Sequence, residues 1–192
     1  CDLNKIMSGI YKNWDEEEFV GYCARFALPI DKKFARFSRG MTMKLSLAAA
    51  FSHKAKLLIL DEPTGGLDPA ARNEILDIIQ EFVCDEEHTV LFSSHITVDL
   101  ERIADRIVFI RGGRIIFSED TIELSETRAV AKFGEEDIPR ISPEEYTGLR
   151  KTPFGCEALV TDRRAFAEKY PDIMLCNASV EDIIVFSSRG VK

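Results

Sequence analysis

The sequence predicts an α/β protein whose central sheet is mainly parallel. Two short apolar runs, residues 57–60 and 89–92, are bounded by polar and turn-forming residues, which is typical of buried strands, and the first is expected to be buried on both faces. A helix with a broad apolar face is predicted between them, from Asp68 to Val83. The order strand, helix, strand indicates parallel pairing through a crossover. With 192 residues, 45% of them hydrophobic, the chain has enough material for one substantial core, or for one core and a small appendage.

Helices are predicted before the first of these strands. Residues 1–36 are mainly helical in pattern, with an acidic helix start at 15–18 and Pro29 as a stop. Ser38 is placed to cap a further helix that runs from Met41 to about Ser52. The first quarter of the chain is therefore expected to be helical.

The second half of the chain begins with a hairpin. Residues 107–110 and 114–117 flank a pair of glycines, which is typical of a tight turn between antiparallel strands. After about residue 120 the pattern changes to short strand-like segments, such as 129–133 and 158–160, separated by polar stretches. Ser179 to Asp182 resembles a helix start with reciprocal capping. This part is expected to be a small α+β extension.

Two adjacent carboxylates follow the first predicted strand. The apolar run 57–60 leads directly into Asp61 and Glu62, which places both acids at the carboxyl end of the sheet, where open α/β sheets bind their ligands. A magnesium ion bound through Asp61 and a water activated by Glu62 would explain two charges at that position. The alternative is a pair of acids that only caps a turn.

Two other segments have the chemistry to meet a phosphate. Ser38, Arg39, Gly40 and Met41 open a predicted helix, whose free N–H groups and positive dipole end favour an anion. An ordinary capped helix is the alternative. His95 follows the second strand, where it can hydrogen-bond a phosphate or serve a structural role.

The order and spacing of these pieces resembles the ATP-binding cassette (ABC) ATPases. Residues 37–41 resemble the signature motif, usually written LSGGQ, and residues 57–61 resemble Walker B, followed by Glu62 as the catalytic acid. Residues 65–68 resemble the D-loop, and His95 the switch histidine. Four motifs agree in order, so the resemblance is specific over residues 1 to about 120.

The resemblance implies a partial P-loop NTPase core in three parts. These are a helical subdomain with the signature helix (1–52), the C-terminal half of the catalytic core (53–120) and an accessory extension (121–192). It implies ATP and Mg²⁺ as cofactors, with Asp61 near the metal and Glu62 and His95 as catalytic residues. The resemblance implies that five further residues bind the nucleotide: Ser38, Arg39, Gly40, Met41 and Asp68. Asp68 also has a second expected role as the cap of the helix that follows it.

The implied partners are a second ATPase subunit, in a homo- or heterodimer, and transmembrane permease subunits. Arg39 and Met41 replace the commonest Gly and Gln of the signature motif and resemble a bacterial exporter-type subgroup. The expected function is ATP-driven transport, with export favoured, by a cytoplasmic protein on the inner face of the membrane. No apolar run has the length of a membrane span, and a signal peptide is not expected.

Two features set limits on this hypothesis. The sequence contains no G-x-x-x-x-G-K-[ST] phosphate loop and no glutamine loop, so the 192 residues alone are expected to be a fragment without ATPase activity. The net charge of −8, without a basic cluster, argues against nucleic acid as a partner. The alternatives are a soluble ABC ATPase in translation or DNA maintenance, and a non-enzymatic interaction module.

Overall fold

The computed structural model describes residues 2–29 and 32–189. The chain divides into two compact units, residues 1–96 and 97–192. The three-part division expected from the sequence stays a prediction. Over the described ranges, no helix combines the length and the apolar character that a membrane span requires.

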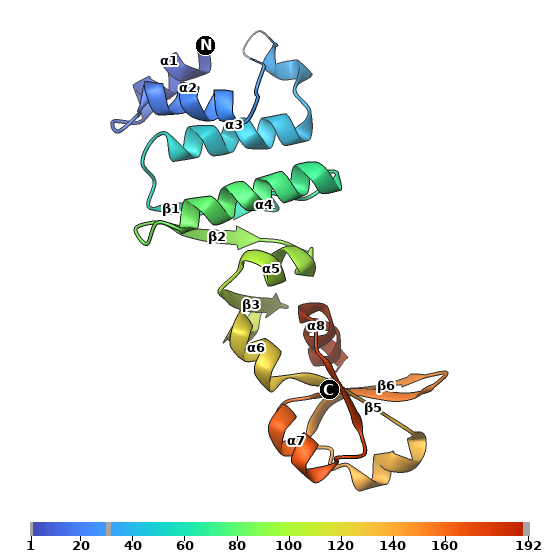
Figure 1. The fold of residues 1–192 in the computed structure, drawn as a ribbon. Coiled ribbons are helices and arrows are strands. Elements are labelled where there is room, and N and C mark those ends of the chain that lie inside the picture. The colour runs from blue at the N-terminus through green and yellow to red at the C-terminus, as the bar shows by residue number, and fades with distance from the viewer. Residues whose placement is uncertain (1, 30–31, 190–192) are drawn as a thin grey trace. The chain divides into compact units, whose positions relative to one another are not determined.

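Unit 1, residues 1–96, is helical at its start and α/β towards its end (Figure 1). Its elements are α1 (Asp2–Ile10), α2 (Glu16–Arg25), the 3-10 helix η1 (Phe34–Arg36), α3 (Arg39–Phe51), β1 (Leu57–Asp61), α4 (Pro69–Val83) and β2 (Thr89–Ser93).

The expected N-terminal helix is two helices, and the second ends earlier than Pro29. Asp15 caps α2 by accepting the N–H of Glu18 at 3.0 Å. The helix ends at Arg25 because Ala27 adopts a φ of +52° and its N–H bonds the carbonyl of Ala24. The N–H of Leu28 bonds the carbonyl of Cys23 at 3.0 Å, which completes a Schellman ending. The stop signal is therefore this motif and not the proline.

The predicted parallel pairing of the two apolar strands is confirmed. β1 and β2 run parallel, with Leu57 opposite Thr89 and Asp61 opposite Ser93. The prediction that β1 is buried on both faces is wrong. Leu58 is buried, but Ile59 on the other face is 71% exposed, because helices of unit 1 cover only one side of this two-stranded sheet.

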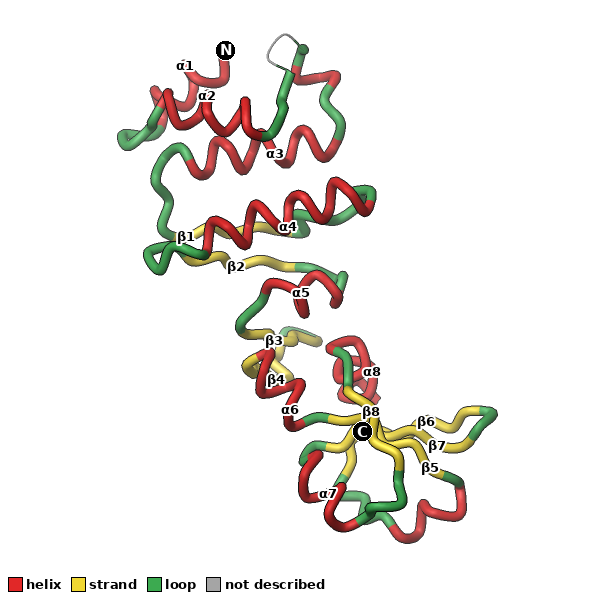
Figure 2. Tube along the Cα trace, viewed as in Figure 1, coloured by secondary structure: helices red, strands yellow, loops and turns green. Residues whose placement is uncertain are grey.

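Unit 2, residues 97–192, contains a hairpin and a four-stranded antiparallel sheet (Figure 2). Its elements are α5 (Thr97–Ile103), β3 (Arg106–Arg111), β4 (Arg114–Asp120), α6 (Thr121–Thr127), β5 (Ala129–Phe133), the 3-10 helix η2 (Glu135–Arg140), β6 (Tyr146–Thr152), β7 (Gly155–Val160), α7 (Arg163–Lys169), β8 (Met174–Asn177) and α8 (Val180–Arg189).

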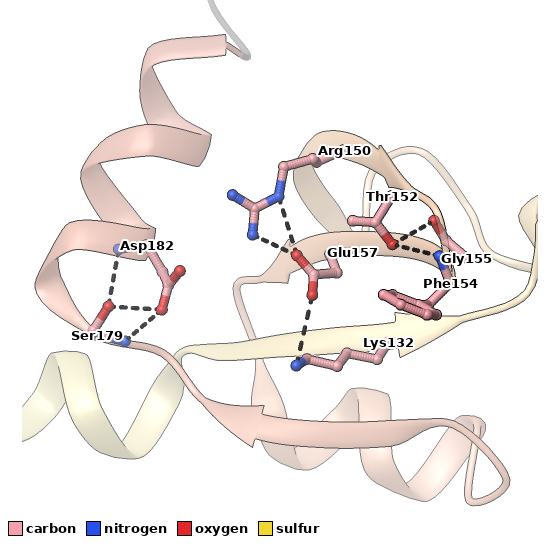
Figure 3. Close-up of polar contacts among 8 residues, drawn as sticks. All are labelled: Lys132, Arg150, Thr152, Phe154, Gly155, Glu157, Ser179 and Asp182. Carbon is pink, nitrogen blue, oxygen red and sulfur yellow. Dashed lines mark hydrogen bonds and ion pairs between the residues drawn. The ribbon is translucent and has the colours of Figure 1, made fainter.

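The hairpin and the α8 start are as predicted. β3 and β4 pair antiparallel, and the turn glycines Gly112 and Gly113 have φ of +56° and +72°, which few other residues tolerate. Ser179 and Asp182 cap α8 reciprocally, since the N–H of each bonds the side chain of the other at 3.1 Å (Figure 3).

The larger sheet, in the order β6-β7-β5-β8, is covered on both faces. Alternate residues of β5 and β7 face two separate cores. Phe166 of α7 and Tyr170, which follows α7, pack in one core with Ala131, whereas Phe186 of α8 packs in the other with Val130. Unit 2 therefore has a core on each side of its sheet.

A row of charged side chains crosses the α8 face of this sheet (Figure 3). Glu157 on β7 lies opposite Arg150 on β6 and Lys132 on β5. Nε of Arg150 donates to Oε2 of Glu157 at 3.0 Å, and Nζ of Lys132 lies 3.5 Å from Oε1. These contacts lower the pKa of Glu157, the hydrogen bonds from Arg150 being the largest cause.

Candidate nucleotide and metal site

The two acids at the end of β1, Asp61 and Glu62, are held by one serine of β2. The hydroxyl of Ser93 donates to Oδ1 of Asp61 at 2.5 Å. The N–H of Glu62 donates to the same hydroxyl and to the Ser93 carbonyl, each at 3.1 Å. The parallel register makes this possible because Asp61 and Ser93 are direct partners in the sheet. Both acids are therefore oriented at the carboxyl end of the strand pair.

Glu62 has an unusual backbone conformation and a histidine partner. Its φ of +48° lies in the left-handed region, which costs about 1–3 kcal/mol for a residue other than glycine. The N–H of Gly65 bonds the Glu62 carbonyl at 3.1 Å and closes the turn. The conformation brings Oε2 of Glu62 to 2.7 Å from Nδ1 of His95, with the two side chains 35% and 74% exposed. The loop after β1 and the loop after β2 thus meet through one carboxylate–imidazole contact.

The hydroxyl of Ser38 caps α3 as predicted, and it is the hydrogen-bond partner of one amide in the first turn of that helix. It accepts the N–H of Met41 at 3.2 Å, and the N–H of Thr42 makes the first bond within the helix. The first turn of a helix leaves its amides without partners inside the helix. Those of Arg39 and Gly40 are therefore the amides that this helix start can offer to an anion.

Asp68 caps α4, and its segment lies against the start of α3. Oδ1 of Asp68 accepts the N–H groups of Ala70 and Ala71, each at 3.0 Å. A Cβ on Gly40 would lie 3.5 Å from Cβ of Ala71 and 3.9 Å from Cδ2 of Leu67. The segments 38–41 and 65–68, which are far apart in the sequence, are therefore packed together.

The site residues form two groups. The first group contains Asp61, Glu62 and His95. The second group contains residues 38–41 and Asp68. Within residues 2–29 and 32–189, no hydrogen bond or ion pair joins Ser38 or Met41 directly to Asp61 or His95. The loop 62–68 begins with Glu62 and ends with Asp68, and so connects the groups along the chain.

The donor set fits a magnesium ion that keeps most of its water. Within the described part of the chain there is no cluster of three or more His, Cys, Asp or Glu side chains suited to a metal. Mg²⁺ bound with ATP needs only one or two protein oxygens, the rest coming from water and phosphate. The exposed carboxylate of Asp61, oriented by the Ser93 hydroxyl, has an oxygen that would suit such an ion.

Ser93 is a site residue that the sequence reasoning did not single out. Its role depends on the register that pairs it with Asp61, and the order of the elements does not give that register. The available signal was its place at the end of the second apolar run, two residues before His95.

Comparison with known proteins shows which family part of this chain resembles. The family described as "ABC transporter" matches residues 7–65. The lantibiotic transport ATP-binding protein SrtF of Streptococcus pyogenes is 45% identical over 92 residues, which are 47% of this chain and 40% of SrtF. The bacitracin transport ATP-binding protein BcrA of Enterococcus faecalis is 36% identical over 138 residues, which are 71% of this chain and 43% of BcrA.

A solved structure supports the fold. A transporter described as of the metal-chelate ABC type, in an inward-facing conformation, superposes with a TM-score of 0.52 at 16% identity, covering 79% of this chain and 59% of that chain. The chain spans less than half the length of the curated relatives that it matches. Over that length, the chain is similar to the ATP-binding subunits of ABC transporters.

Proposed function

We propose that these residues supply the hydrolytic acids and the signature segment of an ATPase subunit that powers transport across a membrane. The observation that carries the proposal is the contact between Glu62 and His95 at the carboxyl ends of β1 and β2, next to Asp61. Phosphoryl transfer to water depends mainly on positioning and on charge neutralisation. A carboxylate that is fixed by a strained turn and an imidazole meets the first of these requirements.

Each residue has a role in this proposal. Glu62 accepts a proton from the attacking water, and His95 holds the Glu62 carboxylate in place through Nδ1. Since Nδ1 is engaged, a γ-phosphate would meet Nε2 of His95. Asp61 binds Mg²⁺ through water, and the ion, when bound, neutralises charge on the phosphates.

The segments 38–41 and 65–68 are proposed to face the nucleotide of a second ATPase subunit. The N–H groups of Arg39 and Gly40 and the hydroxyl of Ser38 offer donors to a γ-phosphate. Asp68 contributes a contact across the dimer interface in addition to its cap. Closure of the dimer on two ATP molecules would drive the movement of permease subunits on the inner face of the membrane.

Export is the proposed direction of transport. It is supported by the signature segment with Arg39 and Met41, and by relatives whose names specify lantibiotic and bacitracin transport. Co-purification of the full-length protein with a membrane permease tests the partner, and co-purification with ribosomes or DNA instead would contradict it.

ATP turnover by the full-length protein tests the hydrolytic role. Glu62→Gln keeps the size of the side chain and removes the base, so we expect turnover to fall by about 10²- to 10⁴-fold. Glu86→Gln, in an exposed turn, is the matched control and should leave turnover unchanged. A Glu62→Gln variant with normal turnover would contradict the assignment. The 192-residue chain alone has no phosphate loop and should show negligible turnover.

A further inference from the structure

The side chain of Arg39 lies over the loop that joins the two groups of site residues. A Cβ on Gly66 would lie 2.7 Å from Nη1 and 3.2 Å from Cζ of Arg39. A Cβ on Gly65 would lie 3.5 Å from Nη2. The guanidinium is therefore in contact range of both glycines, on the side where their missing side chains would be.

The other side of the loop is fixed by burial. Pro63, Thr64, Gly65 and Leu67 are buried, whereas Gly66 is exposed and has a φ of +69°. Turn hydrogen bonds join the N–H of Gly65 to the Glu62 carbonyl at 3.1 Å and the N–H of Leu67 to the Thr64 carbonyl at 3.2 Å. Arg39 thus covers the outward part of a loop whose inward part is already held.

From this geometry we infer that Arg39 is a positioning residue that clamps the loop 62–68 of its own chain. The inference rests on the proposed function, because it assigns the clamp to the loop that begins with the proposed base, Glu62. The loop holds Glu62 in a left-handed conformation that the surrounding structure must maintain. A guanidinium suits this task because it is planar and presents five N–H donors in a rigid fork.

The clamp also gives Gly65 and Gly66 a specific purpose. The positive φ explains a glycine at position 66, but Gly113 has a similar φ of +72° with nothing within 4 Å of its Cβ position. At Gly66 the same position is occupied by Arg39. The side chain of Arg39 therefore contacts the loop, while the backbone N–H of Arg39 stays available to an anion at the start of α3.

Hydrogen exchange of the 192-residue chain tests the clamp without any catalysis. In Arg39→Ala we expect the amides of Gly65 and Leu67 to exchange about threefold faster or more, because local opening of the loop becomes easier. Arg36→Ala, an exposed arginine three positions earlier, is the control and should change neither amide. Unchanged exchange in Arg39→Ala would overturn the inference.

A second variant tests the same contact by changing its loop side, at Gly66. Gly66→Ala displaces the guanidinium and strains φ, so it should also speed exchange. In the Arg39→Ala background only the strain remains, so Gly66→Ala should add less there than in the wild type. Equal increments in both backgrounds would contradict a contact between the two residues.

Turnover of the full-length protein separates positioning from a role in nucleotide binding. Arg39→Ala should lower kcat by about three- to a hundredfold, as expected for a misplaced catalytic group, with KM for ATP within about twofold of wild type. A raised KM with normal kcat would place the guanidinium on the nucleotide and overturn the inference. Wild-type protein without turnover would count against the proposed function instead, and the exchange experiment would still decide on the clamp.

Discussion

The two sheets of this chain are covered to different extents. In unit 2 the sheet β6-β7-β5-β8 has a core on each face, with Phe186 of α8 and Phe166 of α7 on opposite sides. In unit 1 the pair β1-β2 buries one face and leaves Ile59 and Leu91, 71% and 60% exposed, on the other. The site residues all belong to unit 1. The stability of unit 2 and the chemistry of unit 1 therefore depend on different residues, which single substitutions can test separately.

The largest effect on stability is expected from the α8 core of unit 2. Phe186 is fully buried among side chains of β5, β7 and α8, and Arg150 lies 5.3 Å from the centre of its ring. Phe186→Ala should lower the free energy of unfolding of unit 2 by about 3–5 kcal/mol, through lost burial and the cavity that remains. Urea unfolding followed by far-UV circular dichroism measures this change.

Fluorescence of Trp14 supplies the control for that experiment. Trp14 is the single tryptophan of the chain and lies in unit 1. If the units are independently stable, the Trp14 transition of Phe186→Ala should keep its wild-type midpoint. A Trp14 transition shifted as far as the circular dichroism transition would break the comparison between the units.

The next effect compares one helix cap in each unit. Asp68 caps α4 in unit 1, and Asp162 caps α7 in unit 2 by accepting the N–H of Ala165 at 2.9 Å. Each Asp→Ala change should cost about 1 kcal/mol in its own unit. Only Asp68→Ala should also lower ATP turnover of the full-length protein, because only Asp68 has a proposed contact across the dimer. Equal turnover in the two variants would leave Asp68 as a cap alone.

A smaller effect is expected in acid, on the charged row of unit 2. The pKa of Glu157 is lowered by the hydrogen bonds from Arg150 and by the charge of Lys132. A lowered pKa stabilises the folded state above the ordinary value of 4.5, and this contribution is lost as the pH falls through the folded-state value. We expect a loss of about 0.5–1 kcal/mol, since both side chains are partly exposed.

Glu157→Gln is the variant that checks this acid effect. It keeps the shape of the side chain without a titrating group, so the stability difference between it and wild type should shrink as the pH is lowered from about 6 to about 3. The measurement is unfolding of unit 2 by circular dichroism at each pH. A difference that stays constant would show that the ion pair does not contribute.

The sequence predicted those parts of the structure that depend on local signals. The caps at Ser38 and Asp68 and the turn at Gly112 are confirmed, because each depends on residues within a few positions of each other. The β6 strand was missed because its segment is mixed in polarity and contains Gly148, which forms a bulge with a φ of +65°. The exposure of Ile59 was also missed, since an apolar run does not say how many faces of a strand are covered.

For the site, the residue types could be predicted from the sequence, but their contacts could not. Asp61, Glu62 and His95 could be named from their places after two apolar runs. Glu62 in a left-handed conformation, and Arg39 over the glycines that follow it, depend on how distant segments pack. Such packing has no local signal, so only the structure could bring these residues together.

The smallest effect on stability is expected at the uncovered face of unit 1. Ile59 projects into solvent from β1, so Ile59→Thr removes little buried area and keeps a β-branched side chain suited to a strand. The free energy of unfolding should change by less than about 0.5 kcal/mol, as monitored by Trp14 fluorescence. The same change should reduce self-association in sedimentation velocity, because exposed apolar side chains on a strand pair favour contact between molecules.

Ile79→Thr is the matched control for the effect on stability, since Ile79 is only 1% exposed and its change should lower the free energy of unfolding several times more. Equal costs at the two positions would mean that the face carrying Ile59 is covered in solution, and the contrast between the two sheets would then disappear.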